Sequence, residues 1–160
     1  MAGLSKVVVD AMGRKDLNDQ EKRCWTVGCL LADEEAEKSK FQRSVEAHVD
    51  DAEKKRNFTT MVGALFEAVC SQDYQGALEG GAVTCKPAHS FKFDGHTHTI
   101  WELKEGKKDR IYFFRKPGWN VLVLFLAFHK KDRQTPDEVK NICEPAARQL
   151  LREKGRPKFC

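Results

Sequence analysis

The stretch that decides the fold is residues 100–136, which read IWELKEGKKDRIYFFRKPGWNVLVLFLAFHKKDRQTP. It contains three alternating or apolar runs joined by two short turns, at residues 105–108 and at Pro117-Gly118. The last run, residues 119–128, is apolar on both faces, which predicts a central strand covered on both sides. It ends in the basic cluster His129-Lys130-Lys131-Asp132-Arg133. The pattern therefore predicts a set of strands that brings cations to one edge of a sheet.

Elements on either side of these runs complete an α+β domain. Apolar residues recur at helical spacing upstream, and β-branched and aromatic residues mark the strands. The expected elements are a short helix over 5–12, a strand over 25–31, helices over 33–56 and 58–70, a strand pairing 91–93 with 97–104, strands over 110–115 and 119–128, and a helix over 136–154. We expect the first two long helices to form an antiparallel hairpin and the Gly-rich residues 72–87 to form a loop. The fold class is thus α+β, with two N-terminal helices packed on a mostly antiparallel four-stranded sheet and a C-terminal helix.

The start of the C-terminal helix carries clear signals. Thr135 is the expected N-cap, Pro136 takes the first helical position and Glu138 the third, which together predict a capping box. Pro145 lies inside the helix and is expected to kink or shorten it, because proline lacks an amide donor.

Length and charge limit the domain organisation and the class of partner. A chain of 160 residues suits one domain, and we expect an extension over 1–20, a domain over 21–154 and a basic tail over 155–160. Residues 1–85 carry 11 Lys and Arg against 15 Asp and Glu, while residues 86–160 carry 17 against 9. The basic half suggests a polyanion or an acidic protein partner, although a solvated surface explains the asymmetry as well.

The cysteine pattern argues against disulfides and zinc. The six cysteines include no Cys-x-x-Cys pair, and we recognise neither a secretory signal nor an apolar run of membrane-spanning length. We therefore expect buried free thiols in a cytoplasmic protein that does not contact membranes. His96 and His98 share one face of a strand and could bind a metal, but Asp94-Gly95 before them favours exposed hairpin histidines. No metal or cofactor is expected.

Five residues of these strands and their basic end offer groups for RNA cleavage. Cations can stabilise the charge of a pentavalent phosphorane, and a cation can donate a proton to the leaving 5′ oxygen. Arg110, Lys131 and Arg133 are the candidates for these roles. Glu102 or His129 could accept the proton of the 2′-hydroxyl.

Neighbouring residues could hold the RNA. Tyr112 shares a strand face with Arg110 and could stack on an unstacked base. Contacts to phosphates would come from Lys104, Lys107, Lys108 and Lys130. The alternative is a solvated or purely binding cluster without catalysis, which is the commoner role of Lys and Arg residues after a strand.

These stretches resemble the RelE/ParE superfamily of bacterial toxins, most closely its HigB-like, phage-derived branch. That branch typically shows LWELR, RIFYFF and VLLHGFxKKTQKTP followed by a helix. This sequence has IWELK at residues 100–104, RIYFF at 110–114 and LFLAFHKKDRQTP at 124–136. The resemblance in motifs covers residues 91–151, and over 25–88 only the order of the elements is similar.

The resemblance implies the toxin of a type II toxin–antitoxin system, a metal-independent, ribosome-dependent mRNA endoribonuclease that inhibits translation. It also implies a cognate antitoxin, expected to be a helix-turn-helix, HigA-like protein. Arg110 matches the arginine proposed to hold the scissile phosphate, and Lys131 and Arg133 lie in the cluster that supplies an acid or a phosphate ligand. Lys104 stands where the branch has arginine, which loses bidentate phosphate contact. Glu102 matches the position of the general-base lysine, so the resemblance does not supply the base.

Two other functions are compatible with the same residues. One is a binding protein of the RelE/ParE fold without nuclease activity, either a poison of DNA gyrase, as in the ParE branch, or a phage or host regulatory protein. The other is a plain RNA- or DNA-binding module, which would bind with strongly salt-dependent affinity and without turnover.

Overall fold

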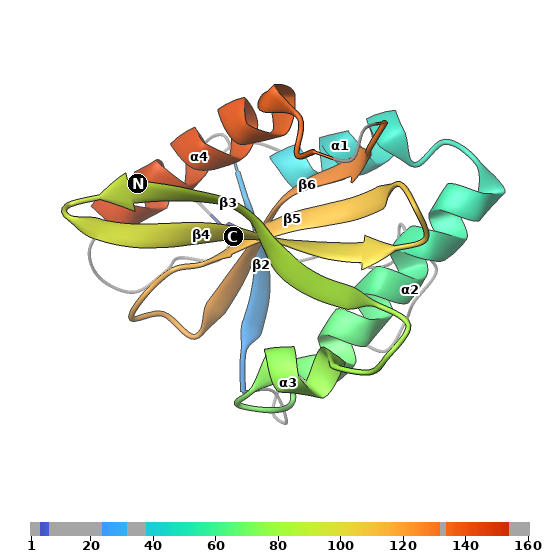
Figure 1. Cartoon of the computed structure of the whole chain (residues 1–160), viewed down its shortest axis with the longest axis horizontal. Coiled ribbons are helices and arrows are strands. Elements are labelled where there is room, and N and C mark those ends of the chain that lie inside the picture. The colour runs from blue at the N-terminus through green and yellow to red at the C-terminus, as the bar shows by residue number, and fades with distance from the viewer. Residues whose placement is uncertain (1–3, 7–23, 32–37, 132–133, 154–160) are drawn as a thin grey trace.

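Six strands form one mixed sheet that carries helices on both faces (Figure 1). The computed structural model describes residues 4–6, 24–31, 38–131 and 134–153. In chain order the elements are β1 (Leu4–Lys6), β2 (Thr26–Leu30), α1 (Lys40–His48), α2 (Ala52–Ala68), α3 (Tyr74–Leu78), β3 (Thr84–Phe93), β4 (His96–Glu105), β5 (Asp109–Arg115), β6 (Val121–His129) and α4 (Asp137–Arg152). The strand order is β1-β2-β6-β5-β4-β3, and neighbours are antiparallel except for β2 and β6, which are parallel.

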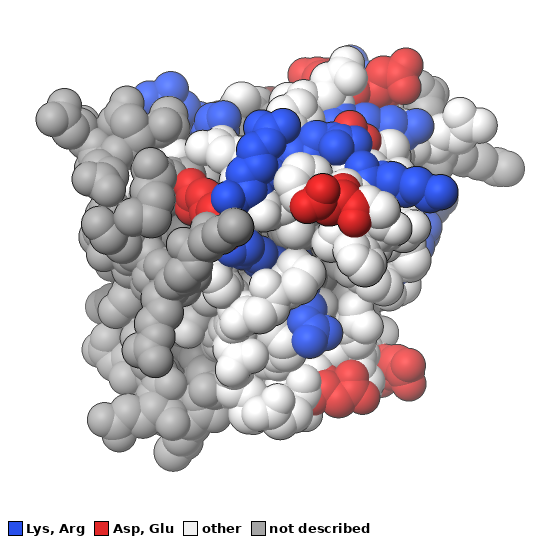
Figure 2. Space-filling view, turned by 90° about the vertical axis from the view of Figure 1, so that its left-hand side faces the viewer, with Lys and Arg blue, Asp and Glu red and all other residues white. Residues whose placement is uncertain are grey.

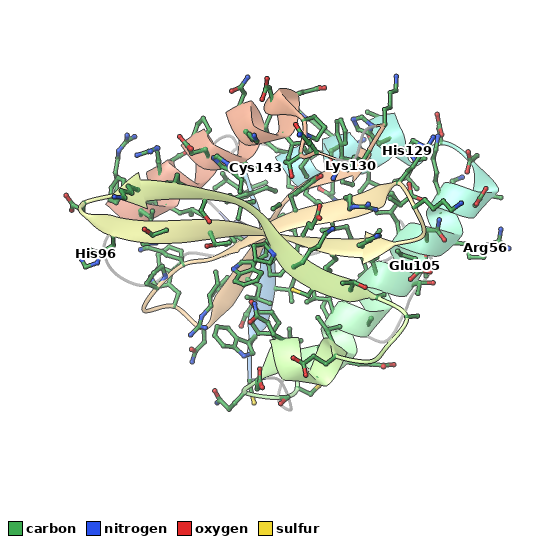
Figure 3. All side chains as sticks on the ribbon, viewed as in Figure 1. Arg56, His96, Glu105, His129, Lys130 and Cys143 are labelled. Carbon is green, nitrogen blue, oxygen red and sulfur yellow. The ribbon has the colours of Figure 1, made fainter. Side chains whose placement is uncertain are left out.

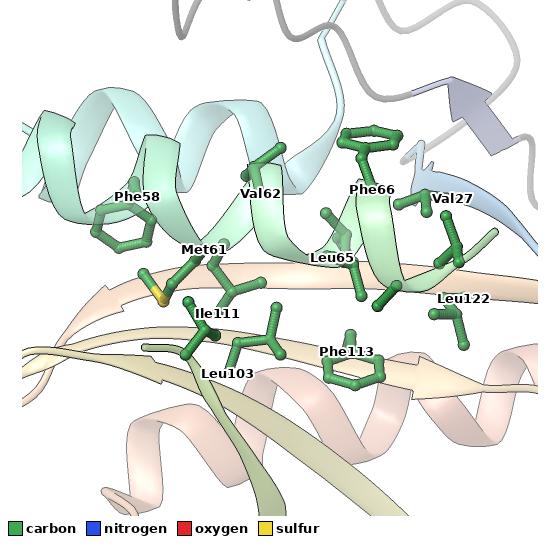
Figure 4. Close-up of a cluster of buried hydrophobic side chains, with 14 of the residues drawn as sticks. Val27, Phe58, Met61, Val62, Leu65, Phe66, Leu103, Ile111, Phe113 and Leu122 are labelled. Carbon is green, nitrogen blue, oxygen red and sulfur yellow. The ribbon is translucent and has the colours of Figure 1, made fainter. Parts of the chain in front are cut away.

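Two helical layers bury the two faces of the sheet, with β6 between them. On one face, α1 and α2 cover a cluster that includes Phe58, Met61, Leu65, Leu103, Ile111, Phe113 and Leu122 (Figure 4). On the other face, α4 covers a cluster that includes Tyr112, Phe114, Val123, Val139, Cys143, Ala147 and Leu150. Because β6 contributes to both clusters, the predicted central strand covered on both sides is confirmed.

The sheet has more strands than the four predicted. The α+β class of the fold and the mostly antiparallel pairing of the strands are confirmed. β3 occupies ten residues and pairs with β4 along its length, from Thr84 opposite Lys104 to Phe93 opposite His96. The expected loop over 72–87 therefore contains α3 and the first part of β3. Residues 5–6, expected in a helix, belong to β1, whose pairing with β2 joins this part of the expected extension to the sheet.

The first two long helices also differ from the prediction. Of the helix expected over 33–56, residues 33–37 lie outside the described residues, and α1 begins at Lys40. The helix is interrupted at residues 49–51, because the Asp51 side chain accepts a hydrogen bond of 2.8 Å from the Lys54 amide and starts α2 there. α1 packs mainly on β6 and β2, while α2 packs on β4, β5 and α3. The two helices therefore lie on the sheet without forming the expected hairpin.

The start of α4 lacks the predicted capping box. Pro136 is the N-cap and makes no side-chain hydrogen bond, while the Thr135 hydroxyl donates to the Ala88 carbonyl of β3 at 3.1 Å. The threonine thus ties the connection to the sheet edge instead of capping the helix. α4 continues through Pro145 to Arg152, so the proline does not shorten it.

The cysteines are free thiols, as predicted, in the part of the chain that the structure describes. Cys29 and Cys143 are buried, and burial raises the pKa of each thiol to about 12. Cys70 is exposed, so burial is not common to all of them. The residues of the expected tail, 155–160, lie outside the described residues.

Ser44 of α1 fixes that helix to the open end of β6. Its hydroxyl accepts a hydrogen bond of 2.8 Å from the Ala127 amide and donates one of 2.6 Å to the Phe41 carbonyl. The last described pair between β2 and β6 is Cys29 with Leu124, so among the described residues no strand pairs with Ala127 on that edge. A helix side chain therefore replaces the missing strand as partner of a buried amide.

We expect Ser44→Ala to lower the free energy of unfolding by about 1–3 kcal/mol, because the buried Ala127 amide loses its acceptor. Urea unfolding followed by circular dichroism measures the change. Thr60→Ala is the control, since the exposed Thr60 hydroxyl bonds only the Arg56 carbonyl of its own helix, and it should change stability by about 0.5 kcal/mol or less. Equal effects of the two variants would contradict the role of Ser44.

Glu144 links α4 to β3 and makes stability depend on pH. Its carboxylate contacts His89 Nε2 at 2.8 Å and Arg148 Nε at 3.1 Å. The hydrogen bond to His89, helped by Arg148, lowers the pKa of Glu144 below its usual 4.5. The folded state therefore favours the charged form, and the contribution is present above the usual pKa and lost as pH falls through the lowered value.

Wild type should consequently lose more stability than Glu144→Gln when pH falls from about 5 to about 3. Urea unfolding midpoints at several pH values test this. Glu138→Gln, at an exposed position in the first turn of α4, should retain the wild-type pH profile. Parallel profiles for wild type and Glu144→Gln would show that the link contributes nothing.

Candidate active site

The predicted site residues that the structure describes lie toward one end of the sheet, where β4 ends, β5 begins and β6 ends. His129 and Lys130 mark this end in Figure 3. Asp109 pairs with His129, and the Lys130 amide still donates to the Lys108 carbonyl at 2.6 Å. Successive side chains of a strand point to opposite faces. This end of the sheet therefore carries two groups of side chains, one on the side of α4 and one on the side of α1 and α2.

The group on the α4 side is a cationic cluster, formed by Lys86, Glu102, Lys104, Arg110 and Lys130. The two Glu102 oxygens lie 3.4 Å from Lys86 Nζ and 3.5 Å from Arg110 Nε. The Glu102 and Arg110 side chains are only 2% and 5% exposed, whereas that of Lys86 is 45% exposed. One carboxylate thus faces four cationic side chains, and the cluster carries surplus positive charge.

The surplus positive charge acts on the pKa of Lys130. Burial lowers the pKa of its ammonium group, Arg110, Lys86 and Lys104 lower it further, and Glu102 acts in the opposite direction. A desolvated amine among like charges gives up its proton more readily than an exposed lysine. An anion bound beside it would relieve the repulsion.

Arg110 holds the turn between β4 and β5. Its guanidinium donates to the carbonyls of Asp109 at 2.9 Å and Lys107 at 3.0 Å. Gly106 in this turn has a φ of +66°, and a Cβ there would lie 3.3 Å from the Asn57 amide nitrogen. The turn therefore needs glycine, both for its backbone conformation and for its close approach to α2.

Tyr112 lies deeper on the same face. Its side chain is fully buried, and its hydroxyl has no hydrogen-bond partner among the described residues. Burial, with a smaller effect of the Glu102 charge, raises the pKa of Tyr112. A ring covered in this way offers no face on which an RNA base could stack.

The group on the α1 and α2 side is centred on a hydrogen-bonded chain of three residues. His129 Nδ1 lies 2.7 Å from Asp109 Oδ1, and the Asn57 amide donates to Asp109 Oδ2 at 2.7 Å. The Asp109 side chain is 5% exposed and that of His129 is 30% exposed. The carboxylate is thus engaged on both oxygens and orients an imidazole that solvent can reach.

The His129 ring forms part of the wall of a pocket of about 390 Å³, which we call the His129 pocket. Its lining also includes His48, Asp50, Lys54, Phe128 and Lys131. Since Nδ1 faces the buried Asp109, the ring presents its Nε2 edge to the pocket.

The charged residues of the pocket are Asp50, Lys54, Lys131 and the exposed Glu138 at the start of α4. Lys54 is held by Asp50 at 2.7 Å and by Asp51 at 3.6 Å. Lys131 is exposed and forms no ion pair within the described ranges. The pocket therefore combines an oriented imidazole with an ammonium group that is available to an anion.

No protein-family model, curated protein or solved structure matches this chain. The sheet topology is therefore the basis for the fold class. Across the described residues no helix is long and apolar enough to cross a membrane. In the same part of the chain, no three His, Cys, Asp or Glu side chains gather as a metal site would require.

The structure separates the predicted catalytic residues. Glu102 and Arg110 lie on the α4 side, whereas His129 and Lys131 line the pocket on the other side. Arg133 lies outside the described residues. Of the predicted RNA-binding residues, Lys107 and Lys108 are exposed in the turn, Lys104 is half-buried, and Lys130 and Tyr112 are buried.

Sequence reasoning missed Asp109, Asn57 and Lys86. Asp109 was detectable in principle, because the strand register puts the residue before Arg110 opposite the end of the apolar strand. Lys86 was missed because the glycines before it predict a loop at residues 72–87, whereas the residue lies in β3. Asn57 comes from a helix far away in sequence, and no local pattern marks it.

The carboxylate should fix the tautomer of His129. We expect neutral His129 to carry its proton on Nδ1, which donates to Asp109, leaving Nε2 with the free electron pair. Long-range proton–nitrogen NMR spectra of the labelled protein identify the tautomer. In Asp109→Ala the preference should disappear, and exposed His96 should keep the same spectrum in both proteins. A proton on Nε2 in wild type would contradict this arrangement.

Proposed function

We propose that the chain is an RNA-cleaving toxin of a type II toxin–antitoxin system that cuts mRNA during translation. The resemblance to the HigB-like branch of the RelE/ParE superfamily suggests this class. The observation that carries the proposal is the imidazole of His129, oriented by a buried carboxylate at an open pocket that also holds Lys131. Such a pair is suited to general acid–base catalysis.

In the proposed reaction, His129 Nε2 accepts the 2′-hydroxyl proton while the 2′ oxygen attacks the adjacent phosphorus. Asp109 stabilises the imidazolium that forms. The Lys131 ammonium stabilises the charge that accumulates on the phosphorane oxygens. The bond between phosphorus and the 5′ oxygen then breaks, and the leaving 5′ oxygen takes a proton from the Lys131 ammonium. The products are a 2′,3′-cyclic phosphate and a 5′-hydroxyl end, and the reaction needs no metal.

The cationic cluster supports this proposal as the binding surface for the RNA backbone. Its exposed or half-exposed members, Lys86 and Lys104, adjoin the exposed Lys107 and Lys108 of the turn. Surplus positive charge attracts phosphates and raises association rates. Arg110 and Glu102 would then act by shaping the turn, since both are buried and engaged.

His129→Gln should lower the rate of mRNA cleavage about 100-fold or more, because the reaction loses its base. Lys131→Ala should also lower it, through loss of phosphorane stabilisation. The rate is measured on a defined mRNA in a reconstituted translation system. Lys92→Ala, at an exposed position on β3, is the matched control and should cleave like wild type.

Growth arrest on expression gives an independent measurement. Arrest should be lost in His129→Gln and weakened in Lys131→Ala and Arg133→Ala, and a cognate antitoxin of helix-turn-helix type should relieve it. Undiminished toxicity in all three variants, with folding intact by circular dichroism, would refute the assignment of the site.

A second function is favoured by the burial of Arg110. The arginine that the resemblance assigns to the scissile phosphate donates here to two backbone carbonyls, as expected for a protein that keeps the fold and binds a partner without cleaving RNA. In that case His129→Gln would leave toxicity and partner binding unchanged and mRNA intact. DNA breaks during expression would identify the partner as gyrase.

A further inference from the structure

A groove of about 490 Å³ lies between α1 and α4, beyond the part of β6 with which the described residues of β2 pair. Phe125 and Leu126 of β6 form its floor, and Ile142 and Ala146 of α4 form one wall. The opposite wall comes from Lys40 and Arg43 of α1. The groove shares no lining residue with the His129 pocket, so it is a separate feature of the surface.

The floor and the α4 wall of the groove are apolar. Ile142 is 38% exposed and is the one large hydrophobic residue classed as exposed among the described residues. Pro145, which also lines the groove, has no amide hydrogen to donate to the Asn141 carbonyl one turn earlier. The α4 wall therefore offers exposed apolar surface to a ligand.

The α1 wall carries positive charge that no described acidic side chain pairs with. Lys40 and Arg43 are one helical turn apart, both are exposed, and neither forms an ion pair within the described residues. Among the described residues, no acidic side chain lines the groove. Figure 2 shows that Lys and Arg side chains also gather across the upper part of the neighbouring face, with some Asp and Glu side chains among them.

We propose that the groove between α1 and α4 binds an acidic amphipathic helix of a partner protein. Apolar side chains on one face of that helix, at spacings of three and four residues, would contact Phe125, Leu126 and Ile142. Carboxylates beside that face would pair with Lys40 and Arg43, and Arg43 offers a bidentate contact. This occupant accounts for both the apolar floor and the charged wall.

A nucleic acid would account for the charged wall of the groove but not for its apolar floor. Its phosphates would pair with Lys40 and Arg43, but its charged backbone would lie against the apolar floor and gain nothing from Ile142. The proposal does not depend on RNA cleavage, because none of its residues belongs to the His129 pocket or the cationic cluster.

The test uses the full chain and a fluorescein-labelled helical peptide of about 16 residues, with Leu at every third or fourth position and Glu on both flanks. Fluorescence anisotropy should show saturable binding to wild type. Binding should weaken at least tenfold in Ile142→Ser and in Arg43→Glu, because each removes one component of the contact. Lys92→Glu, which reverses an exposed charge outside the groove, is the matched control and should bind like wild type.

Charge reversal on both sides provides a second readout. A peptide with Lys in place of Glu should bind the Lys40→Glu/Arg43→Glu variant more tightly than it binds wild type. The absence of saturable binding to wild type, or equal binding of a scrambled peptide, would overturn the proposal. So would a short RNA duplex that binds through Lys40 and Arg43 more tightly than the peptide.

The same variants keep the two proposals separate. Arg43→Glu should retain mRNA cleavage while losing the peptide, and His129→Gln should retain the peptide while losing cleavage. A failure of cleavage in wild type would then refute the proposed function without affecting the peptide result.

Discussion

The burial of β6 on both faces is the constraint on which the rest of the structure depends. Eight consecutive residues of this strand are buried, and the strand pairs with β2 on one side and β5 on the other. Its side chains alternate between the two cores except at Phe125 and Leu126, which both enter the core on the α4 side. The sheet therefore requires a helical layer on each face. The division of the functional residues into two groups follows directly, because His129 and Lys130 continue the same alternation beyond the buried run.

Alternation along strands could be read from the sequence, and so could the turns between them. As the pattern predicts, Trp101 and Leu103 point to one face of the sheet, and Glu102 and Lys104 point to the other. The errors occurred where a contact distant in sequence decides the structure. Thr135 stands at the position of an N-cap, but its hydroxyl donates to a β3 carbonyl instead. The glycines before β3 suggest a loop, whereas the backbone of β3 pairs with β4.

In the candidate site, too, the local sequence predicts part of the arrangement, and contacts between residues far apart in sequence decide the rest. Residue types and strand order were enough to bring His129, Lys131 and Arg110 to one end of the sheet. They were not enough to show that His129 and Arg110 face opposite layers, or that a buried carboxylate engages His129. Asn57 supplies the second contact to that carboxylate from α2, so the geometry of the site depends on how the helix packs on the sheet.

β3 lies at the edge of the sheet, and its irregular pairing has a consequence for solubility. An exposed ten-residue edge is a template on which a second molecule could add a strand. Pro87 removes one amide from this edge, the register shift between Pro87 and His89 interrupts its regular spacing, and the exposed Lys86 and Lys92 repel an identical edge. β3 therefore forms the edge of the sheet in its own molecule, and these features oppose pairing of that edge with a strand of a second molecule.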